Sequence, residues 1–150
     1  LQELLEVYER HGASVVAVRR VPRDMVSRYG IVEGSRVEDA GCDLYSLRRL
    51  VEKPVPEDAP TDLAITGRYL FNPEIFDCID RVEAGADGEV QLTDAMNVLA
   101  GSSSVQALLW RAQRYDIGNK ADYVRCFLDF ARRHPETKDA VAAYLQDLDR

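Results

Sequence analysis

The sequence is poor in residues that form disulfides or bind zinc. Only three cysteines and two histidines occur among its 150 residues. Cys42, Cys78 and Cys126 lie far apart, no CxxC pair is present, and their odd number argues against a closed set of disulfides. With only His11 and His134 besides, no zinc site of cysteine and histidine can be assembled. We therefore expect a reducing, cytoplasmic setting in which the cysteines are small core residues.

Long apolar runs, a secretion signal and a common phosphate loop are also missing. No apolar stretch approaches the roughly 20 residues that a membrane-spanning helix needs, so no membrane partner is expected. The chain opens on Leu1 without a basic signal segment or a start methionine, which suggests a piece of a longer protein. Neither GxxxxGK[ST] nor GxGxxG occurs in the sequence.

Positive charge is outnumbered by negative charge. The 19 lysines and arginines against 26 aspartates and glutamates give a net charge of −7 and a pI near 4.9. An acidic surface repels phosphodiester backbones, so a nucleic-acid polymer is not an expected partner, although a local basic pocket for a small phosphate is compatible with it. Hydrophobic residues make up 46% and charged residues 30%, which is typical of a folded domain. This length predicts one compact unit over residues 1–150.

Short apolar runs alternate with helical patterns, which predicts an α/β fold with a mixed β-sheet and C-terminal helices. Asn72 and Pro73 are expected to start a helix with Phe76 on its buried face, and Asn119 is expected to cap a long helix with an apolar stripe that includes Phe127. The last two strands are expected to form a hairpin or a bent pair. Strands are predicted at 15–18, 30–33, 44–53, 63–71, 105–110 and 113–117.

Glu52 and Lys53 are the first candidate site residues, because they end a predicted strand just before Pro54. A carboxylate can accept hydrogen bonds from neighbouring sugar hydroxyls, and an ammonium group beside it can neutralise a phosphate. Together the two groups suit a sugar phosphate. The alternative is a solvated strand end, since surface charges usually contribute little.

A glycine inside a predicted strand is the second candidate feature. Gly67 is expected to mark either a close approach of the backbone to a ligand or a simple β-bulge. Tyr69 beside it can offer a flat face and a hydroxyl to a sugar. Residue type and spacing leave both interpretations open.

Asp116 is the third candidate, at the end of a predicted strand and just before a helix start, where α/β sheets collect ligands. Its carboxylate suits Mg²⁺, a hard cation that prefers oxygen ligands. Lys120 and the amides of that helix start can receive phosphate oxygens. The alternative is a tight turn in which Asn119 is only the helix cap.

Five segments, in this order, resemble the bacterial UTP–glucose-1-phosphate uridylyltransferases, which are sugar-nucleotide nucleotidyltransferases with a Rossmann-like fold. They are residues 28–32 (RYGIV), 51–54 (VEKP), 64–69 (AITGRY), 88–95 (GEVQLTDA) and 116–120 (DIGNK). The resemblance covers nearly the whole chain but only the C-terminal part of such an enzyme. The family's glycine-rich GxGTRxxPxTK loop and an earlier metal-binding aspartate have no counterpart here.

The resemblance implies roles for individual residues. Gly30 would let its backbone approach the hexose, Glu52 would bind sugar hydroxyls and Tyr69 would line the sugar pocket. Lys53 would be a catalytic contact to phosphate, and Asp116 would be a catalytic ligand of the cofactor Mg²⁺. The implied substrate-binding residues are Gly30, Glu52, Lys53, Gly67, Tyr69 and Lys120.

The implied reaction is transfer of a uridylyl group from UTP to glucose 1-phosphate, which gives UDP-glucose and pyrophosphate. The chain alone is expected to be inactive, because half of the nucleotide site is missing, and the whole protein is expected to be a homo-oligomer. Two alternatives are a relative that uses dTTP and a non-catalytic module that binds a sugar phosphate or mediates assembly. The charged set at Glu52, Lys53 and Asp116 argues against the second.

Overall fold

The chain forms two compact units where the sequence alone predicted one. The computed structural model describes residues 1–38, 41–84 and 88–148. The two units are residues 1–111 and 112–150. No proline-rich or glycine-rich linker marks the boundary between them, so composition gave no sign of it. Among the described residues, none of the helices is both long and apolar enough to cross a membrane.

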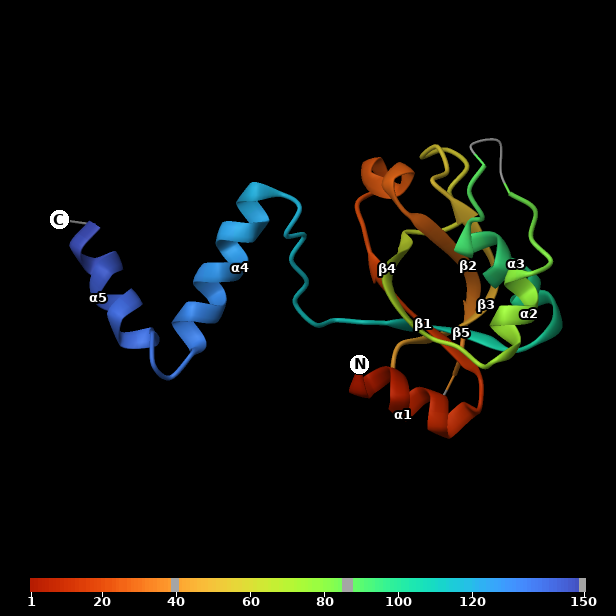
Figure 1. The fold of residues 1–150 in the computed structure, drawn as a ribbon, viewed down its shortest axis with the longest axis horizontal. Coiled ribbons are helices and arrows are strands. Elements are labelled where there is room, and N and C mark those ends of the chain that lie inside the picture. Colours follow the sequence, from red (N-terminus) through yellow and green to blue (C-terminus); the bar gives the residue numbers. More distant parts are fainter. Residues whose placement is uncertain (39–40, 85–87, 149–150) are drawn as a thin grey trace. The chain divides into compact units, whose positions relative to one another are not determined.

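A closed five-stranded sheet forms the centre of the first unit (Figure 1). Its strands follow one another around the sheet in the order β1-β4-β2-β3-β5, and β5 pairs back onto β1. The β1–β5 pair is parallel and the other pairs are antiparallel, so the predicted mixed sheet is confirmed. The strands are β1 (Ser14–Arg20), β2 (Gly30–Arg36), β3 (Leu44–Glu52), β4 (Leu63–Leu70) and β5 (Val105–Leu109).

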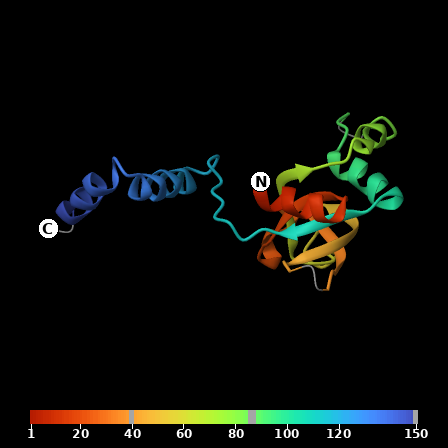
Figure 2. The same cartoon turned by 90° about the horizontal axis from the view of Figure 1, so that it is seen from below.

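The helices of the first unit pack on both faces of β1, as its unbroken apolar run predicts. Helix α1 (Gln2–His11) covers one face (Figure 2). On this face Leu4 packs with Val15. On the other face, Val16 joins a cluster with α2 (Glu74–Ile79) and α3 (Leu92–Ser102). A short 3-10 helix, η1 (Arg23–Arg28), links β1 to β2.

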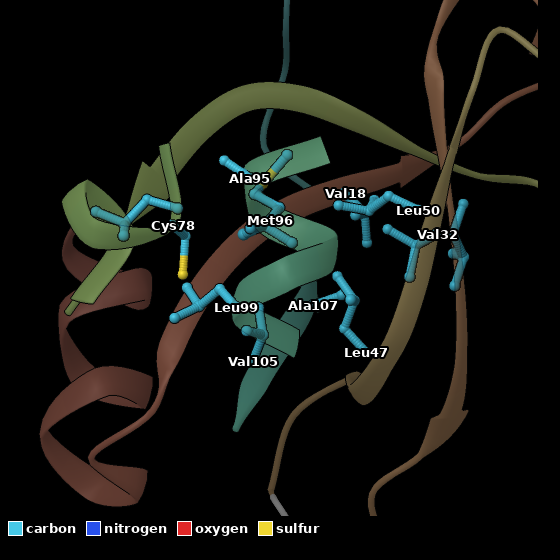
Figure 3. Close-up of a cluster of buried hydrophobic side chains, with 13 residues drawn as sticks. Val18, Val32, Leu47, Leu50, Cys78, Ala95, Met96, Leu99, Val105 and Ala107 are labelled. Carbon is cyan, nitrogen blue, oxygen red and sulfur yellow. The ribbon is translucent and has the colours of Figure 1, made fainter. Parts of the chain in front are cut away.

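The main core cluster is centred on α3. Met96 and Leu99 lie between Cys78 of α2 and strand residues such as Val18 and Leu50 (Figure 3). All of these side chains are buried. Helix α3 therefore joins the second helix to the sheet.

Helix α2 differs from its prediction in two respects. The predicted buried residue Phe76 is 70% exposed, and Cys78 is buried instead, three residues after the buried Ile75. The side chain of Asn72 does not cap the helix. Its Nδ2 donates instead to the carbonyl oxygen of Gly12 at 3.3 Å. With only six residues in α2, packing rather than helical periodicity decides which side chains are buried.

Leu99→Ala is expected to lower the free energy of unfolding by about 2–5 kcal/mol. The Leu99 side chain is fully buried in the α3 cluster, so its removal leaves a cavity as well as losing buried apolar area. Urea unfolding followed by circular dichroism measures the change. Leu5→Ala is the matched control, since Leu5 is 41% exposed on α1 and its truncation should cost less than about 1 kcal/mol. Equal losses for the two variants would contradict the assignment of the core.

The second unit contains α4 (Lys120–Arg133) and α5 (Lys138–Leu148). The predicted strand at 113–117 is wrong, because polar groups of this segment bond to α4 instead of to a strand: Tyr115 donates its hydroxyl to the Asp129 carboxylate at 2.5 Å. The apolar stripe of α4 is present, but no described residue of α4 or α5 is buried, and Phe127 is 65% exposed.

Candidate functional site

The chain turns sharply where β3 ends, at the pair Glu52 and Lys53. Adjacent side chains of a flat strand point to opposite faces of the sheet, so two neighbours reach one ligand only if the strand bends. Lys53 has a φ of 44°, in the left-handed region, and its backbone N–H donates to the carbonyl oxygen of Tyr29 at 3.0 Å. Its Nζ lies 3.8 Å from Oε1 of Glu52. The two charged groups therefore converge just before Pro54.

The left-handed conformation of Lys53 is itself informative. For a residue with a Cβ atom it costs about 1–2 kcal/mol, and such conformations cluster at ligand-binding sites. Lys53 is the one residue other than glycine with a positive φ in the described part of the chain. This unfavourable conformation occurs at the residue whose ammonium group lies beside a carboxylate.

A buried threonine and a glycine position the Glu52 carboxylate. Thr93, 7% exposed in the first turn of α3, donates its hydroxyl to Oε2 of Glu52 at 2.7 Å. Gly30 faces Glu52 across the β2–β3 pair. A Cβ atom on Gly30 would lie 3.0 Å from the same Oε2 and 2.9 Å from Cδ1 of Ile65. The missing side chain of Gly30 thus leaves room for the carboxylate.

Gly67 lies in a β-bulge, which confirms one of the two interpretations of this position. The β1–β4 register passes from Val16 opposite Tyr69 to Val18 opposite Ile65, so residues 66–68 face one residue of β1. Gly67 has a φ of 72° within this bulge. The bulge reorients β4 just before Tyr69.

Tyr69 lies near the Glu52 carboxylate. Its ring stacks on that of Phe71, with the centroids 5.4 Å apart. Burial, and then the negative charge of Glu52, raise the pKa of the Tyr69 hydroxyl above its usual value, which is itself well above neutral pH, and the hydroxyl is a neutral hydrogen-bonding group. Gly30, Glu52, Lys53 and Tyr69 are therefore brought together by three strands of the first unit.

Asp116 and Lys120 lie in the second unit, Asp116 on a tight turn before α4 and Lys120 in the first turn of that helix. The Asp116 carboxylate accepts the backbone N–H of Gly118 at 3.2 Å, and its carbonyl accepts the N–H of Asn119 at 2.9 Å. Asn119 caps α4 as predicted, accepting the backbone N–H of Ala121 at 2.9 Å. Lys120 is exposed at the first position of the helix. The predicted strand end before Asp116 is wrong, whereas the turn and the helix start are confirmed.

The chemistry of Asp116 fits a magnesium ligand. Carboxylate oxygens are the donors that Mg²⁺ prefers, and it commonly takes only one or two of them together with substrate phosphates. Asp116 is exposed, its Oδ1 accepts the Gly118 N–H, and Asp122 lies close enough for its carboxylate to accept the Asp116 N–H at 3.3 Å. The part of the chain that the structure describes holds no group of three or more aspartate, glutamate, histidine or cysteine residues arranged for a metal ion.

The comparison with curated proteins gives close relatives. The chain is 45% identical over 147 residues to UTP–glucose-1-phosphate uridylyltransferase 2 of Streptococcus pyogenes serotype M3. It is 44% identical over 147 residues to the UTP–glucose-1-phosphate uridylyltransferase of Streptococcus pneumoniae serotype 4. Each alignment covers 98% of this chain and 48% of the relative. The chain therefore spans about half the length of the curated relatives it matches.

Solved structures share the fold. A UDP-glucose pyrophosphorylase complexed with UDP-glucose superposes with a TM-score of 0.78 at 31% identity, over 89% of this chain and 49% of that one. The UTP-bound UGPase of Acinetobacter baumannii gives 0.82 at 28% identity, over 97% and 49%. The expected α/β nucleotidyltransferase fold with a mixed sheet is thereby confirmed. A family model described as "Nucleotidyl transferase" matches residues 1–147, so the chain belongs to the nucleotidyl transferase family.

Proposed function

We propose that the protein containing this chain transfers a uridylyl group from UTP to glucose 1-phosphate, and that this chain supplies the side that holds the sugar phosphate. The names of the relatives support the substrates. The observation that carries the assignment to this chain is the left-handed turn at Lys53, which places an ammonium group 3.8 Å from the Glu52 carboxylate. A hexose phosphate carries the complementary pair, a row of hydroxyls and a phosphate.

The residues of the first unit would have distinct tasks in this reaction. Glu52 accepts hydrogen bonds from two hexose hydroxyls, and the neutral hydroxyl of Tyr69 lies beside that carboxylate. Lys53 neutralises the phosphate that attacks the α-phosphorus of UTP, so that two anions can approach each other. The backbones at Gly30 and Gly67 border the sugar.

The second unit would bind Mg²⁺ and phosphate. Asp116 is our proposed Mg²⁺ ligand, and Lys120 our proposed phosphate contact at the start of α4. When bound, Mg²⁺ supplies charge neutralisation at the reacting phosphates. Asp116 contributes a carboxylate oxygen to it, and Asn119 fixes the helix start that carries Lys120.

The proposal includes the setting of the protein. We expect a cytoplasmic homo-oligomer, and the three cysteines, all of which lie among the described residues as thiols, are compatible with a reducing compartment. The chain by itself is expected to be inactive. Two outcomes would favour the alternatives: a higher kcat/KM with dTTP than with UTP would indicate a thymidylyltransferase, and binding of the sugar phosphate without turnover by the whole protein would indicate a non-catalytic module.

Glu52→Gln in the whole enzyme is expected to lower kcat/KM for glucose 1-phosphate roughly ten- to a hundredfold. One acceptor oxygen and the negative charge are lost, and a hydrogen bond to a charged group is worth about 1.5–3 kcal/mol. Pyrophosphate release at varied glucose 1-phosphate measures the effect. The matched control is Glu33→Gln, which removes a carboxylate from the same sheet, where it pairs with Arg48 and Arg49. An unchanged dependence on glucose 1-phosphate in Glu52→Gln would reduce Glu52 to a solvated strand end.

A further inference from the structure

The hydroxyl of Thr93 donates a hydrogen bond to the Glu52 carboxylate. Thr93 is 7% exposed, and its Oγ1 donates to Oε2 of Glu52 at 2.7 Å, across 41 positions of sequence. The helix that carries it is fixed to the same strand one turn later. The Asn97 side chain accepts the backbone N–H of Leu50 at 2.6 Å and donates to the Leu50 carbonyl at 2.9 Å. Helix α3 therefore bonds both the backbone of β3 and the charged side chain at its end.

Spacing along the helix explains why one helix can do both. Residues four positions apart lie on one face of a helix, so Thr93 and Asn97 both face β3. Asn97 fixes the position of β3 along the helix by bonding the backbone of Leu50, which lies two residues before Glu52. With the strand fixed, the Thr93 hydroxyl has to select only the rotamer of the Glu52 side chain.

We propose that Thr93 is a positioning residue that orients the Glu52 carboxylate for the sugar hydroxyls; this inference rests on the function proposed above. A free glutamate at a strand end samples several rotamers, and a ligand would have to select one of them. With Oε2 held by Thr93, the Oε1 oxygen lies toward Lys53, at 3.8 Å from Nζ. The carboxylate is thus oriented before the sugar phosphate arrives, which lowers the entropy lost on binding.

Gly30 constrains the same carboxylate from the other side. A Cβ atom there would lie 3.0 Å from Oε2, which is tighter than nine in ten real Cβ contacts, so in Gly30→Ala the carboxylate has to shift by a few tenths of an ångström against its hydrogen bond to Thr93. The two nearest atoms, Cδ1 of Ile65 and Oε2 of Glu52, are the far ends of flexible side chains, and Oγ1 of Thr93 at 3.7 Å would be in ordinary contact. The substitution should therefore move the carboxylate without preventing folding.

The test compares variants of the whole enzyme in their dependence on glucose 1-phosphate. Thr93→Val keeps the shape of the side chain and removes the hydroxyl, and it is expected to raise KM for glucose 1-phosphate roughly tenfold while kcat changes less than about twofold. Thr93→Ser keeps the hydroxyl and should restore KM. Thr61→Val is the control, because Thr61 donates its hydroxyl to the Val32 carbonyl, away from Glu52. It should lower the melting temperature and leave KM unchanged.

A second set of variants shows through which residue Thr93 acts. In a Glu52→Gln background, Thr93→Val should raise KM much less than in the wild type, since the oriented charge is already gone. A full effect in that background, or an unchanged KM in Thr93→Val when Glu52→Gln alone raises it, would overturn the positioning role and leave the proposed function standing. If Glu52→Gln itself leaves KM unchanged, both proposals fail. Should Thr93→Val not fold, Gly30→Ala is expected to raise KM by displacing the same carboxylate, and an unchanged KM there would also overturn the role.

Discussion

Asp116→Asn is expected to lower the turnover of the whole enzyme by about a hundred- to a thousandfold at limiting Mg²⁺. A bound metal ion stabilises the developing charge by several kcal/mol, and a neutral amide is a poorer ligand than a carboxylate. The fold should be retained, because the asparagine oxygen can still accept the Gly118 N–H in the turn before α4. Steady-state rates across a Mg²⁺ titration measure the effect, and part of the lost rate should return at high Mg²⁺.

A control from the same unit separates this role from a general effect of charge. Asp139→Asn removes a carboxylate from the first turn of α5 and should leave turnover and its Mg²⁺ dependence unchanged. Thermal melts of both variants show whether folding is affected. If Asp116→Asn turned over at the wild-type rate at limiting Mg²⁺, Asp116 would be only a turn residue.

Lys53→Ala is expected to lower kcat roughly ten- to a hundredfold and also to raise KM for glucose 1-phosphate. The lost ammonium neutralises a phosphate in the bound state and more so in the transition state, where a charged hydrogen bond is worth about 1.5–3 kcal/mol. Lys53→Arg keeps the positive charge and should retain more activity than Lys53→Ala. Initial rates at varied UTP and glucose 1-phosphate separate the two parameters. An unchanged kcat in Lys53→Ala would contradict a role in the chemical step.

The left-handed backbone at Lys53 offers a way to separate stability from activity. Alanine at a φ of 44° keeps the strain of an L-residue, whereas glycine adopts this conformation freely. Lys53→Gly should therefore unfold at a higher urea concentration than Lys53→Ala, although both lack the ammonium group and should be similarly inactive. If the less stable of the two variants were also the less active one, folding and not the missing charge would explain the low rate.

Most of the fold could be predicted from short-range sequence patterns. The apolar run at β1, the proline that ends β3 and the asparagine that caps α4 each determine structure within a few residues. The segment 113–117 misled because its alternation resembles a strand, while Tyr115 and Asp116 bond to side chains of α4. A pattern of residue types reports which positions are apolar, but not which polar partner a backbone group finds.

The candidate site was predictable only in part, for a related reason. Glu52 and Lys53 stand out because opposite charges precede a proline, and such neighbours reach one ligand only if the strand bends, as it does at Lys53. Thr93 lies in the segment 88–95 that carries the resemblance, but the sequence does not reveal its hydrogen bond to Glu52, which joins two positions 41 residues apart. Contacts of this kind depend on tertiary packing, which a single sequence does not display.

The parallel pairing of β1 with β5 has a consequence for synthesis on the ribosome. The first strand begins at Ser14 and the last one ends at Leu109, so the sheet closes only after all the strands between them have been made. At about 5–20 residues per second, translation needs roughly 5–20 s to cover this distance. During that time β1 and β3 lack the partner that β5 provides, and an unpaired strand edge promotes aggregation. Emergence of β5 ends this interval, because one short strand covers both edges at once.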